Sequence, residues 1–415
     1  MNLLFAWRYF KSKKSTNAIN IIAWISVLAI VVGTASLIVL LSVFNGFEDL
    51  VKSLYASFYT DIKISPKRGK TLILTHEQLQ KIKSVSGVKD YSLVAEEKAL
   101  IQNGDLQTIV YMKGVDDRYE KVTEVASHVK RGSFKTGTAD APLAVLGIGI
   151  ENALQVESDK AILPLTVYLP KKGVPVSEGS VKSIGNTDPL QSLSTDNVHT
   201  SGAFIIQQDF DNKYIITNLD FLKRMLNLQA DEYGAAEIIL NNSNDDDKVK
   251  QQLKLLLGEN YVVQTRYEQN KSLYSIMQVE KWVIYAILSL ILVVAAFTMI
   301  GALTMLVLEK QKDIQLLKAI GSDNKRIQSI FLNEGILLAG IGGILGVLLA
   351  VLICWLQVKY KLIALQGGTF VIDHYPVKIS AIDILLVLCT VMIVALIASW
   401  FPARKAALQP IELKT

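Results

Sequence analysis

Few residues of this chain are arranged for catalysis or for metal binding. The GKT run at 69–71 resembles the end of a phosphate-binding loop, but the first glycine of that motif would fall at position 64, which is Ile64. The HE pair at 76–77 begins a zinc-protease pattern, but the second histidine would fall at Gln80. The chain has four histidines and two cysteines, and its sequence contains neither a His/Cys cluster nor a GxSxG element. We therefore expect no catalytic residue, no metal site and no cofactor bound by this chain, which is not expected to be an enzyme.

Ionisable side chains are also missing where an ion-coupled carrier would need them. Four apolar segments, at about 20–44, 282–308, 335–358 and 384–403, contain no Asp, Glu, Lys or Arg. Proton relays and ion pathways in membranes are built from such side chains. A chain without them must draw its energy for any transport from a partner.

The four apolar segments are long enough to be membrane spans. Each has about 20–27 residues, and a helix rising 1.5 Å per residue needs about 20 to cross a hydrocarbon core of about 30 Å. The first is too long for a cleavable signal peptide and is expected to stay as an anchor. Residues 45–281, between the first two spans, are polar enough and long enough to fold as a domain. We predict an α-helical membrane protein with four transmembrane helices and a large exported α+β domain.

The placement of Lys and Arg predicts the orientation. Residues 1–19 carry four basic and no acidic residues, the 309–334 connection carries five basic residues, and the 404–415 tail carries three. By the positive-inside rule these three segments are cytoplasmic, so 45–281 and the short 359–383 loop are exported. Residues 1–19 are expected to form an interfacial helix. The net charge of +5 is too small to indicate a nucleic-acid partner.

The 309–334 connection has the pattern of two short amphipathic helices that meet at a sharp corner. Ile314, Leu316, Leu317 and Ile320 have the apolar spacing of a helix that lies on a surface. Gly321 suits the left-handed end of the first helix, and Ser322 or Asp323 suits the cap of the second. A hairpin between two spans is a lever for a partner to push. Residues expected to couple to this partner, which the resemblance given below implies is an ATPase, are Lys312, Asp313, Ile314, Leu317, Lys318, Ala319, Ile320, Gly321, Lys325 and Arg326. We expect the apolar ones to fill a groove and the charged ones to fix the register; the alternative is a solvated connector.

Small residues recur at helical spacing in two of the spans. They are Gly33, Gly335, Ala339, Gly342, Gly343 and Gly346. Small side chains let membrane helices approach closely. Two interpretations stay open, packing within the four-helix unit and contact with a second permease subunit.

The exported region alternates helix-like and strand-like segments. We predict a helix break at 45–46, a strand at 61–65, a helix at 76–85 and a hairpin at 103–104. Residues 116–202 form a β-rich insertion, whose 170–202 part has the composition of a long loop. From position 269 a helix is expected to continue into the second span.

Several motifs are similar to those of one family. They are WRY at 7–9, SVFNGF at 42–47, LGIGI at 146–150, EKQKDIQLLKAIG at 309–321 and FPARKAALQPI at 401–411. With the four-span layout they resemble the FtsX-like permease superfamily of type VII ABC systems, and within it the LolC/LolE lipoprotein-releasing group.

The resemblance implies a pair of permease subunits in an inner membrane, with ATP and Mg bound on two copies of a cytoplasmic ABC ATPase. It also implies a lipoprotein cargo, passed to a periplasmic carrier that docks near 170–202; a loop without a partner is the alternative there. Two other functions stay open. One is MacB-like efflux of small molecules or peptides, and the other is FtsX-like signalling to an exported enzyme.

Overall fold

A computed structural model describes residues 17–160, 162–170, 193–364 and 374–410 of the protein and divides into two compact units. The membrane unit contains residues 17–50, 275–364 and 374–410, and the sheet unit contains the described residues between 51 and 274. Most of the predicted interfacial segment at 1–19, and the last residues of the tail, lie outside the described residues.

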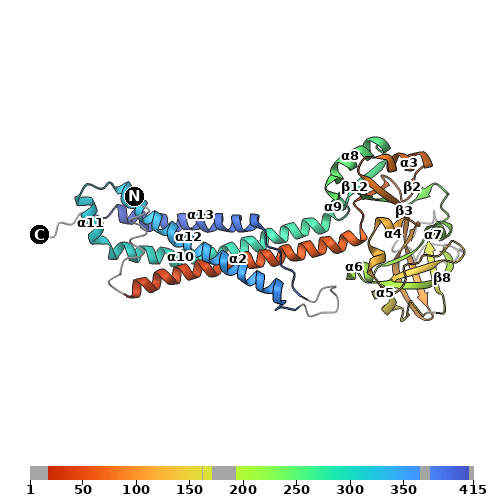
Figure 1. Cartoon of the computed structure of the whole chain (residues 1–415), viewed down its shortest axis with the longest axis horizontal. Helices are drawn as coiled ribbons and strands as arrows, with labels where there is room; N and C mark the ends of the chain where they lie inside the picture. The colour runs from red at the N-terminus through yellow and green to blue at the C-terminus, as the bar shows by residue number, and fades with distance from the viewer. Residues whose placement is uncertain (1–16, 161, 171–192, 365–373, 411–415) are drawn as a thin grey trace, which may run out of the picture. The chain divides into compact units, whose positions relative to one another are not determined.

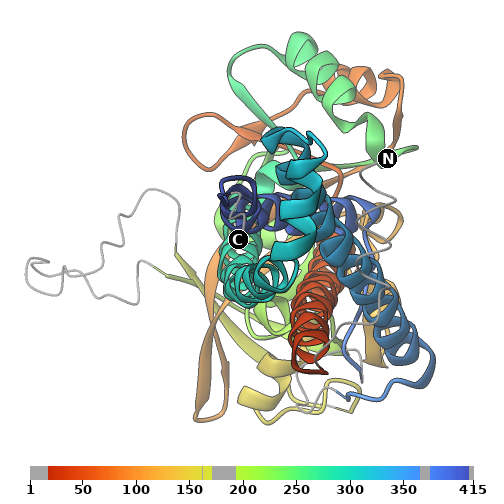
Figure 2. The same ribbon diagram turned by 90° about the vertical axis from the view of Figure 1, so that its left-hand side faces the viewer.

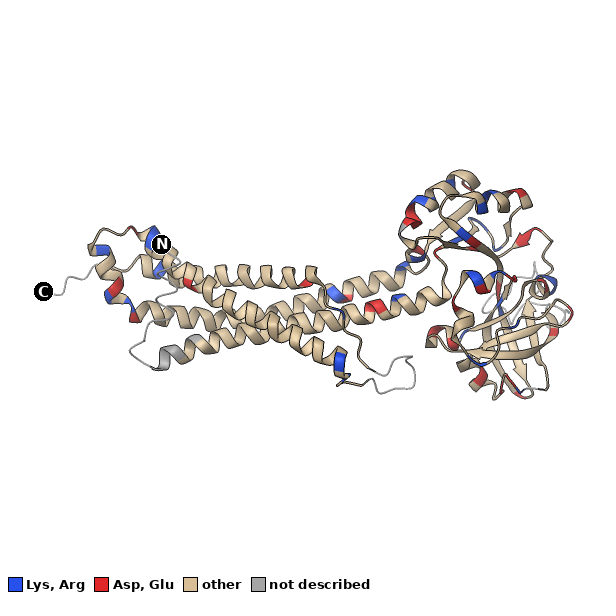
Figure 3. Cartoon of the chain, in the orientation of Figure 1, with Lys and Arg blue, Asp and Glu red and all other residues tan. Residues whose placement is uncertain are grey.

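Among the described residues, four helices are long and apolar enough to cross a membrane, and most of their length belongs to the membrane unit. They are α2 (Asn17–Phe58), α10 (Lys271–Glu309), α12 (Asn324–Tyr360) and α13 (Ala381–Ala407), with the short α11 (Gln311–Ala319) between α10 and α12 (Figure 1). Charged residues lie toward the ends of these helices, and their middles carry none (Figure 3). The predicted helix break at 45–46 is wrong, because α2 continues through both residues.

The small residues of α12 are packed against other helices of the same unit. A Cβ atom at Gly342 would lie 2.8 Å from Ile30 Cγ2, and one at Gly346 would lie 2.6 Å from Thr34 Cβ, both on α2. A side chain there would overpack the contact, which typically costs about 1–3 kcal/mol. Gly33, Gly335 and Gly343 similarly face Leu292, Ser399 and Leu388, and Ala339 is fully buried. Packing within the unit therefore accounts for these residues.

The sheet unit is organised around one ten-stranded sheet, in the order β12-β1-β11-β3-β4-β9-β6-β8-β5, with β7 paired to both β3 and β8. The strands are β1 (Ile62–Pro66), β3 (Val88–Asn103), β4 (Leu106–Val115), β5 (Val129–Gly132), β6 (Leu143–Gly147), β7 (Leu165–Pro170), β8 (Leu193–Phe204), β9 (Tyr214–Asn218), β11 (Ala235–Leu240) and β12 (Tyr261–Thr265). A two-stranded sheet pairs β2 (Leu72–Ile73) with β10 (Glu232–Tyr233).

Six of these strands close into a ring. β3 pairs with β4, and the pairing continues through β9, β6, β8 and β7 back to β3. The alternating burial along β7 points every second side chain into the interior of the ring, as in a small barrel. The strands of the predicted insertion at 116–202 therefore belong to the same sheet as β3 and β4.

Short helices cover the rest of the sheet unit. They are α3 (His76–Ser84), α4 (Tyr119–Val122), η1 (Val125–His128), α5 (Ile148–Ala153), α6 (Gln208–Asp211), α7 (Leu219–Leu226), η3 (Ser243–Asp245), α8 (Asp246–Leu257) and α9 (Arg266–Gln269). Thr75 forms a capping box with Gln78 at the start of α3. Phe221 and Leu222 of α7 join the hydrophobic core of the sheet.

The predicted loop at 170–202 is wrong for its second part. Residues Leu193–Phe204 form β8, and Pro170 pairs with Leu193 where β7 ends. The segment contains Ser, Asp, Asn and Gly, which favour turns over strands, so pairing on both edges overrides its composition. Residues 171–192, which include most of the proposed carrier-docking stretch, lie outside the described residues.

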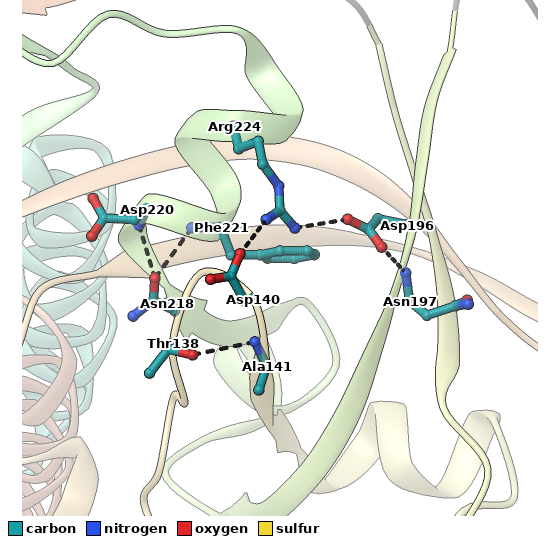
Figure 4. A network of polar contacts seen from close by, with 9 residues as sticks. All are labelled: Thr138, Asp140, Ala141, Asp196, Asn197, Asn218, Asp220, Phe221 and Arg224. Carbon is teal, nitrogen blue, oxygen red and sulfur yellow. Dashed lines mark hydrogen bonds and ion pairs between the residues drawn. The ribbon is translucent and has the colours of Figure 1, made fainter.

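A polar network holds β8 to its neighbours (Figure 4). The Arg224 guanidinium of α7 lies 3.0 Å from the Asp196 carboxylate of β8 and 3.4 Å from Asp140. Asn218 caps α7 by accepting hydrogen bonds from the amides of Asp220 and Phe221. The middle of the β7–β8 pair is therefore connected to α7 through the Asp196–Arg224 ion pair.

Candidate coupling site

The connection between α10 and α12 is a helical corner, as predicted, although its second arm is longer than expected. α10 ends at Glu309, α11 ends at Ala319, and α12 begins at Asn324 and continues into the third span without a break. Gly321 has φ +90°, the left-handed conformation that favours glycine. The amide of Gly321 donates to Lys318 O and the amide of Ser322 donates to Leu317 O, which together form a Schellman motif. The corner is therefore defined by its backbone hydrogen bonds.

One face of α11 is attached to the membrane unit itself. Ile314 is only 1% exposed and belongs to the core of the unit, with Ile327 and Phe331 of α12. The prediction that Ile314 fills a groove on a partner ATPase is therefore wrong, because the unit's own helices already cover its side chain. Ile314, Leu317 and Lys318 lie on the face of α11 that is turned toward the other helices of the membrane unit.

Lys318 connects α11 to the end of α13. Its ammonium group donates to Ala407 O at 2.8 Å and to Gln409 O at 2.6 Å. The last carbonyl groups of a helix carry partial negative charge, which favours a cation at this position. Figures 1 and 2 show α11 turned across the end of the bundle beside the end of α13. α11 therefore contacts the end of the fourth span directly, in addition to connecting α10 with α12.

The opposite face of α11 carries exposed apolar side chains. Leu316 is 63% exposed and Ile320 is 77% exposed, and Lys312 and Ala319 are exposed beside them. Leu316 was not among the expected coupling residues. Its spacing of four from both Lys312 and Ile320 is the signal for a second helical face. We call Lys312, Leu316, Ala319 and Ile320 the α11 face.

The remaining expected residues divide between the two sides. Leu317 is half-buried, and Asp313 is partly exposed and lies 3.4 Å from Lys310 in an ion pair. Lys325 and Arg326, in the first turn of α12, are exposed. The corner thus presents two large apolar side chains on α11 and two cations across the turn, a combination that suits a protein partner with an apolar groove and an acidic rim.

Two family models and several curated proteins are similar to this chain. Residues 285–411 match the family model of the FtsX-like permease C-terminal domain, and residues 23–166 match that of the MacB-like periplasmic core domain. The lipoprotein-releasing system transmembrane protein LolE of Haemophilus influenzae is 28% identical over 429 residues, covering 98% of this chain and 97% of that protein. The lipoprotein-releasing system transmembrane protein LolC of Neisseria meningitidis is 24% identical over 422 residues, covering 99% and 98%. Among solved structures, the periplasmic region of MacB from Actinobacillus actinomycetemcomitans aligns with a TM-score of 0.35 and 10% identity, covering 55% of this chain and 98% of that one.

Proposed function

We propose that this chain is a permease of the LolC/LolE type that releases lipoproteins from an inner membrane in an ATP-driven system. The matches to the FtsX-like permease C-terminal and MacB-like periplasmic core domain models support this proposal. The observation that carries the proposal is the match over nearly the whole length to lipoprotein-releasing transmembrane proteins. The chain holds no arrangement for catalysis in its sequence, so ATP is hydrolysed on a separate ABC ATPase in two copies. A second permease subunit, of the same or a related sequence, completes the membrane part.

The α11 face is the docking surface for the ATPase. Two exposed apolar side chains, Leu316 and Ile320, lie beside Lys312, and Lys325 and Arg326 lie across the corner. Exposed ion pairs contribute only about 0–1 kcal/mol each, whereas a buried Leu or Ile contributes about 1.5–3 kcal/mol. The apolar side chains therefore supply most of the affinity, and the cations set the orientation.

Movement of α11 drives the release step. Closure of the ATPase dimer shifts α11, and Ile314 and Lys318 carry the shift into the helices that they contact. α10 is one continuous helix from Lys271 to Glu309, so its start moves with its end. An acyl anchor needs only apolar walls, each buried CH₂ contributing about 0.8 kcal/mol, and the lipid-exposed faces of the spans supply such walls. The released lipoprotein passes to a periplasmic carrier.

The test is to purify the detergent-solubilised chain and identify the bound proteins by mass spectrometry. Lipoproteins with acylated N-termini, together with an ABC ATPase, are the expected result. An ATPase without lipoprotein contradicts the proposed cargo. That result favours the MacB-like efflux function, which the match to the MacB-like periplasmic core domain supports as the second candidate.

A further inference from the structure

Three polar side chains from three different helices meet in the membrane unit at the end opposite to α11. They are Asn45 of α2, Lys281 of α10 and Asp383 of α13. The Lys281 ammonium lies 2.8 Å from Asn45 Oδ1 and 3.4 Å from Asp383, and the Asn45 amide donates to Asp383 Oδ2 at 2.5 Å. Each of the three groups thus contacts both of the others.

The backbone of Pro376, Val377 and Lys378, which we call the strap, crosses α2 beside this cluster. A Cβ atom at Gly46 would lie 2.7 Å from the amide nitrogen of Val377, so only glycine allows the chain to approach α2 this closely. The amide of Lys378 donates to Ser42 O, and the Lys378 ammonium lies 2.7 Å from Asp49. The strap leads directly into α13 and fixes Asp383 next to Asn45. The Asn45–Gly46 pair therefore serves this crossing, not a helix break.

The helices below the cluster are packed unequally. α12 contacts α2 through glycines with no space for a methyl group. Between α10, α2 and α13, in contrast, lies a narrow apolar cavity lined by Ile30, Leu292, Met299, Val391 and Ala395. The seam between α10, α2 and α13 therefore contains a gap that the α12–α2 contact lacks, although Gly33 of α2 packs closely against Leu292 of α10. The cluster closes this seam at one end.

The cluster is strong enough to order the helix ends and weak enough to open. The side chains of Lys281 and Asp383 are 25% and 13% exposed. Water can therefore replace part of their contacts, and an ion pair of this kind is less costly to separate than a fully buried one. Water cannot replace the close contacts that the glycines of α12 make with α2 in the same way.

We propose that Asn45, Lys281 and Asp383 form a latch that holds α10 against α2 and α13, and that the latch opens once in each ATP-driven cycle. The inference rests on the proposed function, because movement of α11 supplies the force on α10. With the latch closed, the seam between these three helices is shut on the side where Lys281 lies. Opening it frees α10 to follow the movement of α11, and this movement displaces the cargo from the apolar faces of the spans.

The test bridges the latch chemically in the chain purified with its ATPase. Lys281→Cys and Asp383→Cys are combined with Cys354→Ala and Cys389→Ser, and the pair is joined with a short bis-maleimide. ATP-driven release of the copurified lipoprotein is expected to slow at least tenfold, while lipoprotein capture stays unchanged. The same double variant treated with a monofunctional maleimide is the control. Release at the control rate from the bridged chain would overturn the proposal.

A second readout separates the latch from the cargo assignment. The yield of bridging is measured without nucleotide and with ATP plus orthovanadate, which requires no lipoprotein. The latch predicts a yield that changes at least threefold between the two states, and equal yields would overturn it. If the unmodified chain captures no lipoprotein but the yield still changes, the proposed cargo fails and the latch stands. Tyr285→Cys with Thr390→Cys, whose parent side chains are hydrogen-bonded between α10 and α13, gives a second pair with the same expectation should the first variant not fold.

Discussion

Replacing both Leu316 and Ile320 with aspartate is expected to weaken binding of the partner ATPase at least a hundredfold. Each of these side chains is largely exposed on α11 and would contribute about 1.5–3 kcal/mol when buried by a partner. Two such losses exceed about 2.7 kcal/mol, which corresponds to a factor of a hundred in the dissociation constant. The measurement is the affinity of the ATPase for the chain in lipid nanodiscs.

Two controls are needed to interpret this result. Ile109→Asp changes a similarly exposed apolar residue of the sheet unit and is expected to leave the affinity unchanged. Raising the salt concentration is expected to weaken binding only modestly, since it screens the surface charges and leaves apolar contacts in place. Unchanged affinity in the double aspartate variant would show that the ATPase docks elsewhere.

The second large effect is expected from a buried ion pair in the sheet unit. Lys113 of β4 and Glu237 of β11 lie 2.8 Å apart, with side chains that are 2% and 3% exposed. The Lys113 ammonium also lies 4.9 Å from the centres of the Phe58 and Tyr119 rings. Burial alone would lower the pKa of Lys113, but the nearby carboxylate of Glu237 outweighs it, so the pKa is raised and Lys113 stays charged. Phe58 is the last residue of α2, so this pair supports the end of that helix.

Glu237→Ala is expected to destabilise the sheet unit by about 3–5 kcal/mol, because it leaves the buried Lys113 charge without its partner. Thermal unfolding of the detergent-solubilised chain and hydrogen exchange in β4 and β11 measure the loss. Replacing both residues, with Lys113→Met and Glu237→Leu, is expected to restore most of the stability. Lys70→Met breaks an exposed pair with Glu97 and is expected to cost at most about 1 kcal/mol. Similar losses in Glu237→Ala and Lys70→Met would contradict this assessment of the buried pair.

The parts of the fold that the sequence predicts well are those governed by local chemistry. The absence of charge over twenty or more residues is sufficient to predict each long helix. The capped start of α3 at Thr75 and the turn after Asn103 follow from residues that favour caps and turns. Even there the turn residues are Gly104 and Asp105, one position later than predicted.

The parts that sequence reasoning missed depend on contacts between distant segments. β8 is a strand because β6 and β7 pair with its two edges, and its own composition does not favour a strand. Glycine at position 46 predicts a helix break from the sequence alone. In the structure it is needed because the backbone at Pro376 and Val377, more than 300 residues later in the chain, crosses α2 there. On α11, periodicity identified an amphipathic helix but could not say which apolar side chains its own unit buries. Ile314 was therefore expected on the docking side, and Leu316, although part of the apolar pattern, was left out of the coupling residues.

The most direct test of the account is ATP-dependent release from proteoliposomes. The chain is reconstituted with its ATPase and a triacylated lipoprotein, and the soluble fraction is assayed for the lipoprotein in the presence of a periplasmic extract. The account predicts release that requires ATP and the ATPase and is lost when Leu316 and Ile320 are replaced with aspartate. Release by the chain without the ATPase, or steady ATP hydrolysis with no lipoprotein released, would contradict it.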